Sequence, residues 1–194
     1  MDKAKIRSMF KCVLVLAVIA LCSGLLLGAF NILTYVDPLQ STYERFAADT
    51  GATFSKMTDE DGQVYGDGSV VYYAVSDDGV YHAFLTEGKG GYGGSVQLYV
   101  YIKDGKIDKI VVGENSETFL NKLDEAKFYA NFIGKEVATL DVLGTDVVSG
   151  ATKSSTAVKN AVNAAVQYYI DGNNQEVQTQ VLQGNVAVGG ENNG

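Results

Sequence analysis

The chain has 194 residues, a formal net charge of −8 and a sequence pI near 4.6. This length suffices for one domain with its own core, and the acidic balance argues against a nucleic-acid partner, because phosphate backbones select basic surfaces. Cys12 and Cys22 lie near the N-terminus and His82 is the single histidine, so iron–sulfur and ordinary zinc sites are excluded, we expect no metal site, and redox chemistry would need an organic cofactor.

An uncharged, apolar run covers residues 12–30, and basic residues precede it. At a rise of about 1.5 Å per residue, such a helix reaches across the roughly 30 Å hydrocarbon core of a membrane. The run exceeds the 7–15 or so apolar residues of a cleaved signal peptide, and Leu21 stands where a lipoprotein signal has a small residue. We therefore predict an uncleaved anchor over residues 1–36, with a cytoplasmic N-terminus and the remaining chain outside the cytoplasm, in the cell membrane.

A membrane-proximal segment is expected over residues 37–69. Asp37-Pro38 ends the anchor, because proline cannot continue a helix and restricts the residue before it. Residues 39–48 follow with the pattern of a short helix, and the polar, glycine-rich residues 59–68 are predicted to form a loop.

Four strand-like runs come next, at residues 70–75, 80–85, 95–102 and 107–112. An Asp-Gly pair between the first two runs, and another between the last two, is a strong hairpin signal. In residues 95–102 aliphatic side chains alternate with aromatic or polar ones, which predicts one buried face. The expected fold class is α+β: one N-terminal transmembrane helix followed by an antiparallel sheet packed with helices.

Two helices are predicted in the C-terminal half. The first covers residues 120–132, with Gly134 as its stop signal. The second runs from Ser154 or Ser155 to residue 170, because its apolar residues recur at helical spacing, and Asp171-Gly172 is expected to end it. The domain would then occupy residues 70–172, and residues 173–194 would be a polar tail.

Two stretches carry the chemistry. Residues 88–94 place glycines around Tyr92, so the backbone there can take a positive φ and approach a ligand closely; a flexible connection between hairpins is the equally weighted alternative. Residues 146–155 hold a small-residue turn, Ser149-Gly150-Ala151-Thr152, that runs into the last predicted helix. The N-terminus of a helix favours an anion, so the Thr152 hydroxyl lies where a phosphate group would be stabilised.

The turn resembles the flavinylation motif of FMN-binding domains, which occur in the G component of the Rnf complex and in the C component of the sodium-pumping NADH:quinone reductase. Asp146 stands three residues before Ser149, and Gly-Ala-Thr follows, as in that family. Three further features agree: the single N-terminal anchor, the Gly91–Gly94 element before a strand, and the acidic pair Glu117-Thr118 after the next hairpin. The resemblance thus covers the anchor and residues from about 70 to 170.

The resemblance implies that FMN is bound covalently, by a phosphodiester to Thr152. It assigns no catalytic acid or base, because the redox chemistry belongs to the flavin. Gly150 and Ala151 would leave room for a flavin transferase, and Ser154 or Ser155 would cap the helix that receives the phosphate. The full set of predicted cofactor-binding residues is Thr152, Ser149, Gly150, Ala151, Ser154, Ser155, Tyr92, Gly93, Gly94, Glu117 and Thr118.

One difference from the family pattern, and one similar run elsewhere in the chain that serves as a decoy, bear on this interpretation. The family usually continues Glu-Thr with Pro-Gly-Leu-Gly, whereas Phe119-Leu120-Asn121 follows here, which indicates a different loop beside the flavin. A similar run, Thr-Gly-Ala-Thr, ends at Thr53, but its aspartate is adjacent and no apolar helix follows. We therefore assign Thr53 to a loop and Thr152 to the flavin.

By the same resemblance, the chain would be the G component of an Rnf-type, ion-translocating ferredoxin:NAD⁺ oxidoreductase. Its expected partners are the other membrane subunits of that complex, the membrane itself and a flavin transferase that uses FAD. Three alternatives remain open: the C component of the sodium-pumping NADH:quinone reductase, a stand-alone extracytoplasmic FMN-binding electron-transfer protein, and an anchored binding domain without flavin.

Overall fold

The computed structural model describes residues 3–35, 38–55, 57–58 and 62–188. It divides into two compact units, Met1–Ser41 and Thr42–Gly194, and each is described by itself. The first unit contains α1 (Lys3–Thr34). Among the described residues, α1 lies in the one stretch that is long and apolar enough to cross a membrane, and no part of its most apolar window is buried. The helix begins earlier and ends later than the apolar run from which it was predicted.

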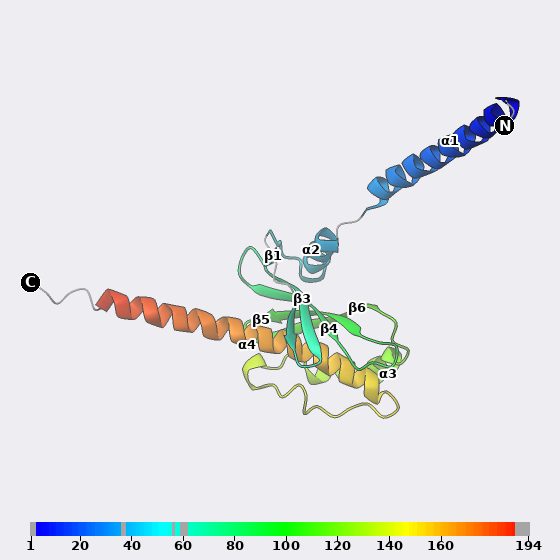
Figure 1. Cartoon of the computed structure of the whole chain (residues 1–194). Helices are drawn as coiled ribbons and strands as arrows, with labels where there is room; N and C mark the ends of the chain where they lie inside the picture. Colours follow the sequence, from blue (N-terminus) through cyan, green and yellow to red (C-terminus); the bar gives the residue numbers. More distant parts are fainter. Residues whose placement is uncertain (1–2, 36–37, 56, 59–61, 189–194) are drawn as a thin grey trace, which may run out of the picture. The chain divides into compact units, whose positions relative to one another are not determined.

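The second unit is built on an antiparallel sheet (Figure 1), with its strands in the order β1-β3-β4-β5-β6 and β2 paired to β3. The predicted α+β class is therefore confirmed. The strands within the described residues are β1 (Met57–Thr58), β2 (Gln63–Tyr65), β3 (Gly68–Val75), β4 (Tyr81–Gly88), β5 (Val96–Lys103) and β6 (Lys106–Asn115).

Both predicted hairpins are present. Between β5 and β6, Lys103 pairs with Lys106, and the two turn residues Asp104 and Gly105 have φ values of 50° and 73°. Positive φ at both central residues is what a two-residue hairpin turn requires, which explains the Asp-Gly pair. Between β3 and β4 the turn contains Gly79, with a φ of 72°.

The loop predicted for residues 59–68 is partly wrong. Residues 59–61 lie outside the described residues, but Gln63–Tyr65 forms β2 and pairs antiparallel with β3. Tyr65 pairs with Gly68, and Gly66, with a φ of 63°, lies in the tight connection between them. Alternation cannot be recognised in a strand of three residues, so this pairing had no signal in the sequence.

One face of the sheet is covered by α4 (Thr152–Val188). The predicted alternation in β5 is confirmed, because its aliphatic residues all point into this core. Each large aliphatic side chain buried here contributes about 1.5–3 kcal/mol relative to exposure. The fully buried members from the two elements are Val96, Leu98, Val100 and Ile102 of β5, and Ala157, Val158, Ala161, Val162, Ala164, Ala165 and Val166 of α4.

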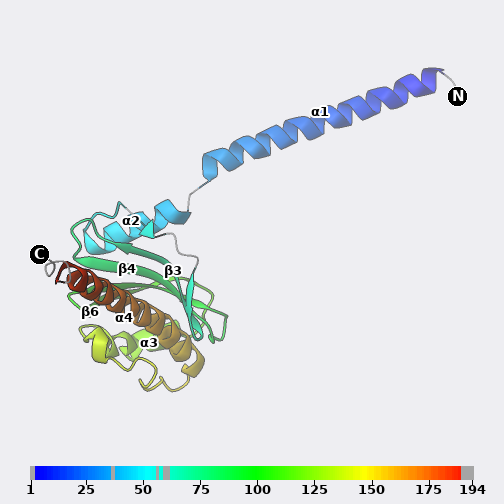
Figure 2. The same ribbon diagram turned by 60° about the vertical axis from the view of Figure 1, so that its left-hand side comes forward.

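The opposite face is covered by α2 (Pro38–Thr50), close to the helix predicted over residues 39–48. Figure 2 shows α2 and α4 on opposite sides of the sheet. Phe46 is fully buried and meets Tyr99 and Tyr101 edge-on, with ring centroids 6.0 Å away in both cases. Tyr101 also donates a hydrogen bond to the Asp49 carboxylate at 2.8 Å, which ties the end of α2 to β5.

The region after β6 contains several short helical segments where one helix was predicted. The single helix expected over residues 120–132 is replaced by α3 (Leu120–Glu125) and a 3₁₀ turn, η1 (Phe128–Asn131), followed by a second one, η2 (Val137–Thr139). Lys127 adopts a left-handed conformation with a φ of 52° and its N–H returns to Asp124 O, which ends the helix.

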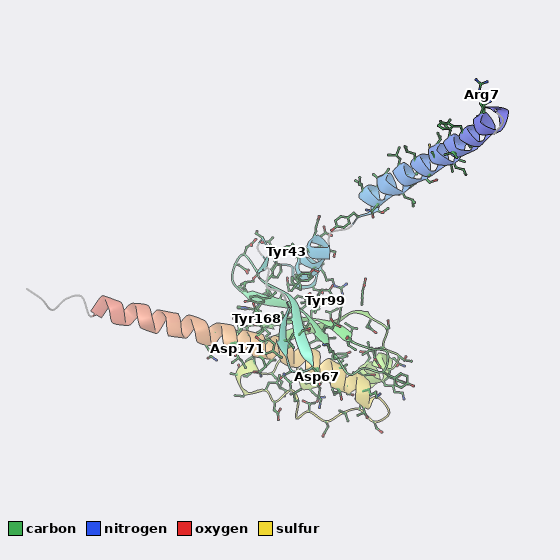
Figure 3. The ribbon with its side chains drawn as sticks, viewed as in Figure 1. Arg7, Tyr43, Asp67, Tyr99, Tyr168 and Asp171 are labelled. Atoms are coloured by element: carbon green, nitrogen blue, oxygen red, sulfur yellow. The ribbon has the colours of Figure 1, made fainter. Side chains whose placement is uncertain are left out.

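The last helix differs from the prediction at both ends. It begins at Thr152 instead of Ser154 or Ser155, and it continues through Gly172 to Val188. Figure 3 labels Tyr168 and Asp171 on α4 near the place where the helix passes the edge of the sheet. Glycine ends a helix when it takes a positive φ, and Gly172 does not. No proline follows it either, so nothing in the chain interrupts the helical backbone there.

Candidate functional site

The segment before α4 is a tight turn held by glycine. Ala151 donates its backbone N–H to Val148 O at 3.0 Å, and Gly150 has a φ of 74°. A positive φ at the third residue is the requirement of a type II turn, and glycine meets it without steric cost. Ser149 occupies the exposed second position of the same turn. The sequence Ser-Gly-Ala therefore turns the chain sharply just before Thr152.

The helix begins directly after this turn. Ser155 N–H donates to Ala151 O at 2.9 Å, so Ala151 occupies the N-cap position and Thr152 is the first helical residue. The expectation that Ser154 or Ser155 caps the helix is therefore wrong. Alanine has no side-chain acceptor, so the first backbone N–H groups of α4 receive no capping bond from the N-cap side chain. These groups remain available to an external anion.

The two serines instead fasten the turn to its surroundings. Both are fully buried. The Ser155 hydroxyl donates to Ala151 O at 2.9 Å and accepts the Val148 N–H at 3.0 Å. The Ser154 hydroxyl donates to Glu117 Oε1 at 2.6 Å. These hydrogen bonds thus hold the first turn of α4 in place.

Thr152 lies in this first turn and faces solvent. Its side chain is exposed, and its backbone carbonyl accepts the Thr156 hydroxyl at 2.9 Å. Within the part of the chain that the structure describes, no recorded hydrogen bond involves the Thr152 hydroxyl. The hydroxyl is accessible to a modifying enzyme, whereas those of Ser154 and Ser155 are not.

The glycine loop between β4 and β5 lies beside this first turn. Gly93 N–H donates to Glu117 Oε2 at 2.8 Å, so the carboxylate that accepts from Ser154 also holds the loop. Farther along α4, Asn160 Nδ2 donates to Lys89 O at 2.9 Å. Gly94 has a φ of 124°, a conformation that L side chains rarely adopt. Lys89 N–H also donates to Asp67 O at 2.8 Å, so the loop is bonded to its neighbours at both ends, which disfavours the interpretation as a merely flexible connection.

Aromatic and cationic side chains alternate around the site. Lys153 Nζ lies 5.7 Å from the centre of the Tyr92 ring, and Tyr92 meets Phe119 edge-on at 5.8 Å. Lys122 Nζ lies 5.0 Å from the Phe119 ring and donates to Gly150 O at 3.3 Å. Each such cation–ring contact contributes about 0.5–1 kcal/mol at an exposed site. Phe119 thus connects the glycine loop with α3.

Lys122 and Lys159 are site residues that the sequence analysis missed. Lys159 Nζ donates to Leu143 O and Thr145 O, both at 2.8 Å, and so holds the loop that leads to the turn. A signal existed for Lys122, because it follows Phe119 by three residues and such pairs share one face of a helix. For Lys159 there was none, since its partners are backbone carbonyls of an irregular loop.

Most of the predicted site residues come together, but not all. Gly93, Glu117 and Ser154 form one hydrogen-bonded group, with Tyr92 and Gly94 in the same loop as Gly93. Thr118 is exposed, as is Asp146, and no recorded hydrogen bond joins either to the site in the described part of the chain.

The decoy threonine lies in a different environment. Residues 52–55 form no helix or strand, and Thr53 O accepts the Asp77 N–H at 2.8 Å. Gly51 before it has a φ of 73° and ends α2 by bonding to Ala47 O. Among the described residues directly after Thr53, 54–55 and 57–58, no helix begins, as expected from the sequence.

Residues 91–167 match the family model described as FMN-binding domain. The matched region begins in the glycine loop and includes Glu117, the turn and the first half of α4. No curated protein and no solved structure matches the chain significantly. The family match supports the resemblance inferred from the motif, and with it a flavin-binding, electron-transfer role.

Proposed function

We propose that the chain carries FMN on Thr152 through a phosphodiester and relays electrons as the G component of an Rnf-type, ion-translocating ferredoxin:NAD⁺ oxidoreductase. The observation that carries the attachment is the pairing of an exposed Thr152 hydroxyl with a helix start whose N-cap is alanine. The exposed threonine and a helix start that has no side-chain cap from its N-cap residue thus occur at the same helix end.

The residues of the site fit such a group. A phosphodiester at Thr152 would lie at the positive end of α4, and an anion there is stabilised by about 0.3–1 kcal/mol at low ionic strength. Lys153 follows directly, and Lys122 reaches the same turn through Gly150 O. Gly150 has no side chain and Ala151 is buried, so neither adds bulk at the surface beside Thr152. Tyr92, 69% exposed, offers an aromatic ring next to Lys153 for contact with the isoalloxazine.

The attachment is a group transfer from FAD. The bond between Thr152 Oγ1 and phosphorus forms, the bond between the two phosphates of FAD breaks, AMP leaves and the hydroxyl proton passes to the transferase. Bound FMN supplies the redox chemistry, whereas this chain holds it, orients it and sets its exposure to water. Covalent attachment suits a relay, because the cofactor cannot diffuse away between two redox partners.

The proposed location follows from α1. Exposed Arg7 and Lys11 precede the apolar stretch, and basic residues are retained on the cytoplasmic side of a membrane. The flavin-bearing unit would then lie outside the cytoplasm, anchored beside the other membrane subunits. This arrangement agrees with the resemblance to the FMN-carrying components of the Rnf complex and the quinone reductase.

The test of attachment is the intact mass of the full chain after co-expression with a flavin transferase. We expect an added FMN, less one water, that survives denaturation in the wild type and in Thr53→Ala, and that is absent from Thr152→Ala. Thr53→Ala is the matched control, because Thr53 also follows a Gly-Ala pair, in the run Thr50-Gly51-Ala52-Thr53, as Thr152 follows Gly150-Ala151. An unmodified wild type in the presence of active transferase would contradict the proposal.

The test of complex membership is co-purification from native membranes. A tagged full chain should bring down other hydrophobic redox subunits in fixed proportion, and the Thr152→Ala variant should do so as well, because the anchor is unchanged. A flavinylated chain that purifies without partners would instead indicate a stand-alone electron-transfer protein.

A further inference from the structure

Glu117 lies where three segments of the chain meet. Its carboxylate accepts the Gly93 N–H through Oε2 at 2.8 Å and the Ser154 hydroxyl through Oε1 at 2.6 Å. Gly93 belongs to the loop between β4 and β5, Ser154 to the first turn of α4, and Glu117 itself to the connection from β6 to α3. One side chain therefore joins the glycine loop to the turn that presents Thr152.

The loop is shaped to receive this carboxylate. A Cβ on Gly91 would collide with Glu117 Oε2, and a Cβ on Gly93 would collide with Ser116 O. On its other side, Glu117 is fixed by its own backbone N–H, which donates to Asn115 Oδ1 at 3.0 Å. The close approach needs glycine at both loop positions, which accounts for residues that a flexible connection would not require.

The two hydrogen bonds of the Glu117 carboxylate restrict where Tyr92 lies. Tyr92 precedes Gly93 directly, so fixing the Gly93 N–H also fixes the peptide that follows Tyr92. The ring is 69% exposed, with Lys153 on one side and the edge of Phe119 on another. Without the carboxylate, the described contacts that restrain the loop reduce to those ring contacts, the Asn160–Lys89 bond and the bond from Lys89 N–H to Asp67 O, and both of these bonds are at Lys89.

We propose that Glu117 is a positioning residue for the flavin: it acts through Gly93 and Ser154 to hold the Tyr92 loop against the first turn of α4 and so restricts the isoalloxazine on Thr152. Both carboxylate oxygens accept a hydrogen bond from the protein, and the proposed role is exerted through these two bonds. The inference rests on the proposed attachment to Thr152.

The experiment measures the time-resolved fluorescence anisotropy of FMN on the full, flavinylated chain, with loading checked by intact mass. We expect Glu117→Ala to increase the amplitude of the fast, local decay at least twofold, because both bonds are lost. Ser154→Ala, which removes one bond, should give an intermediate value. Glu117→Gln should stay near the wild type, since the amide can accept from Gly93 and donate to the Ser154 oxygen.

Two controls separate positioning from general loss of stability. Glu125→Ala removes an exposed carboxylate at the end of α3 and should leave the anisotropy unchanged. Phe46→Leu lowers stability from the opposite face of the sheet, and it too should leave the local decay unchanged even where it melts at the same temperature as Glu117→Ala.

The outcomes are distinct. A wild-type chain without FMN overturns the attachment and this inference together. A loaded chain whose local decay is the same in the wild type and in Ser154→Ala overturns the positioning role alone, and this comparison stands even where Glu117→Ala does not fold. The positioning role is also overturned if the amplitude of the fast decay rises equally in Phe46→Leu, since the change in anisotropy would then follow the loss of stability.

Discussion

Gly68 and Gly88 pair across β3 and β4, and α4 lies so close to both that a Cβ on either glycine would collide with a backbone carbonyl of the helix. The carbonyls are those of Asn160 and Ala157, one turn apart. This pair of glycines sets the distance between the helix and the sheet near the first turns of α4. It therefore also sets the distance between the sheet and the first turn of α4, which carries Thr152.

Replacing Gly88 by alanine should lower the free energy of unfolding by about 1–3 kcal/mol, because overpacking of a close helix–sheet contact forces a backbone shift. Urea denaturation measures the change. Gly172→Ala is the matched control, since no atom outside its own helix lies within 4 Å of the added methyl group. A Gly88→Ala variant as stable as the wild type would show that α4 can lift from the sheet without cost.

The same Gly172→Ala variant tests the length of α4. Inside a helix, alanine is favoured over glycine by about 0.8–1.0 kcal/mol, so helix content should rise, as measured by far-ultraviolet circular dichroism. A helix that ended at Gly172 with a left-handed cap would respond in the opposite direction, because alanine is strained there. The sign of the change distinguishes the observed helix from the tail predicted for residues 173–194.

Gly150→Ala should strain the turn before Thr152. The position has a φ of 74°, which costs an alanine about 1–2 kcal/mol, and the new methyl group would lie 3.1 Å from Lys122 Nζ. We expect lower stability in urea and slower FMN attachment by the transferase. Ser149→Ala in the same turn is exposed and should change stability by no more than about 0.5 kcal/mol.

Asp49→Asn should show a pH-dependent loss of stability. Partial burial raises the pKa of Asp49, but hydrogen bonds from Arg45 and Tyr101 and the charges of Arg45 and Lys109 outweigh it, so the folded pKa lies below its ordinary value of 3.8. The contribution is thus present above the unfolded pKa and disappears as pH falls through the folded one. Urea titrations should show a constant gap between wild type and variant above about pH 5, narrowing below about pH 4. A gap that does not narrow would contradict this linkage.

Tyr129→Phe should stabilise the protein. The Tyr129 hydroxyl is buried and has no hydrogen-bond partner among the described residues, an arrangement that costs about 1–3 kcal/mol. Burial, and secondarily Asp124, raises its pKa above the ordinary value. Ionisation on unfolding therefore weakens the wild type above about pH 10, and the advantage of phenylalanine should widen there. Thermal unfolding at neutral and alkaline pH measures both effects.

The sequence predicted those parts of the fold whose signals are local and periodic. The Asp-Gly turns, the alternation in β5 and the apolar stripe of α4 each follow from the spacing of a few neighbouring residues. Element ends were less predictable, because they depend on backbone conformation. Gly172 is helical although glycine commonly ends helices, and Lys127 is left-handed although lysine seldom is.

For the site, the motif and the resemblance indicated the right segments but not their connections. Gly93, Glu117 and Ser154 were named separately as cofactor-binding residues, and only the fold shows that they bond to one another. The contacts of Lys159 could not be predicted from the sequence, because its partners are main-chain carbonyls that any residues at 143 and 145 would supply. Attachment to Thr152 stays a prediction until the mass is measured.

The position of Thr152 in the first turn of α4 has a mechanical consequence. Carrier proteins that shuttle a tethered group usually hold it on a long, mobile side chain, whereas the proposed attachment atom here belongs to the same helix that closes the hydrophobic core. A group fixed at this point has only the reach of its own bonds. Under the proposed attachment, redox partners would have to be brought to the domain, or the domain as a whole would have to travel to them.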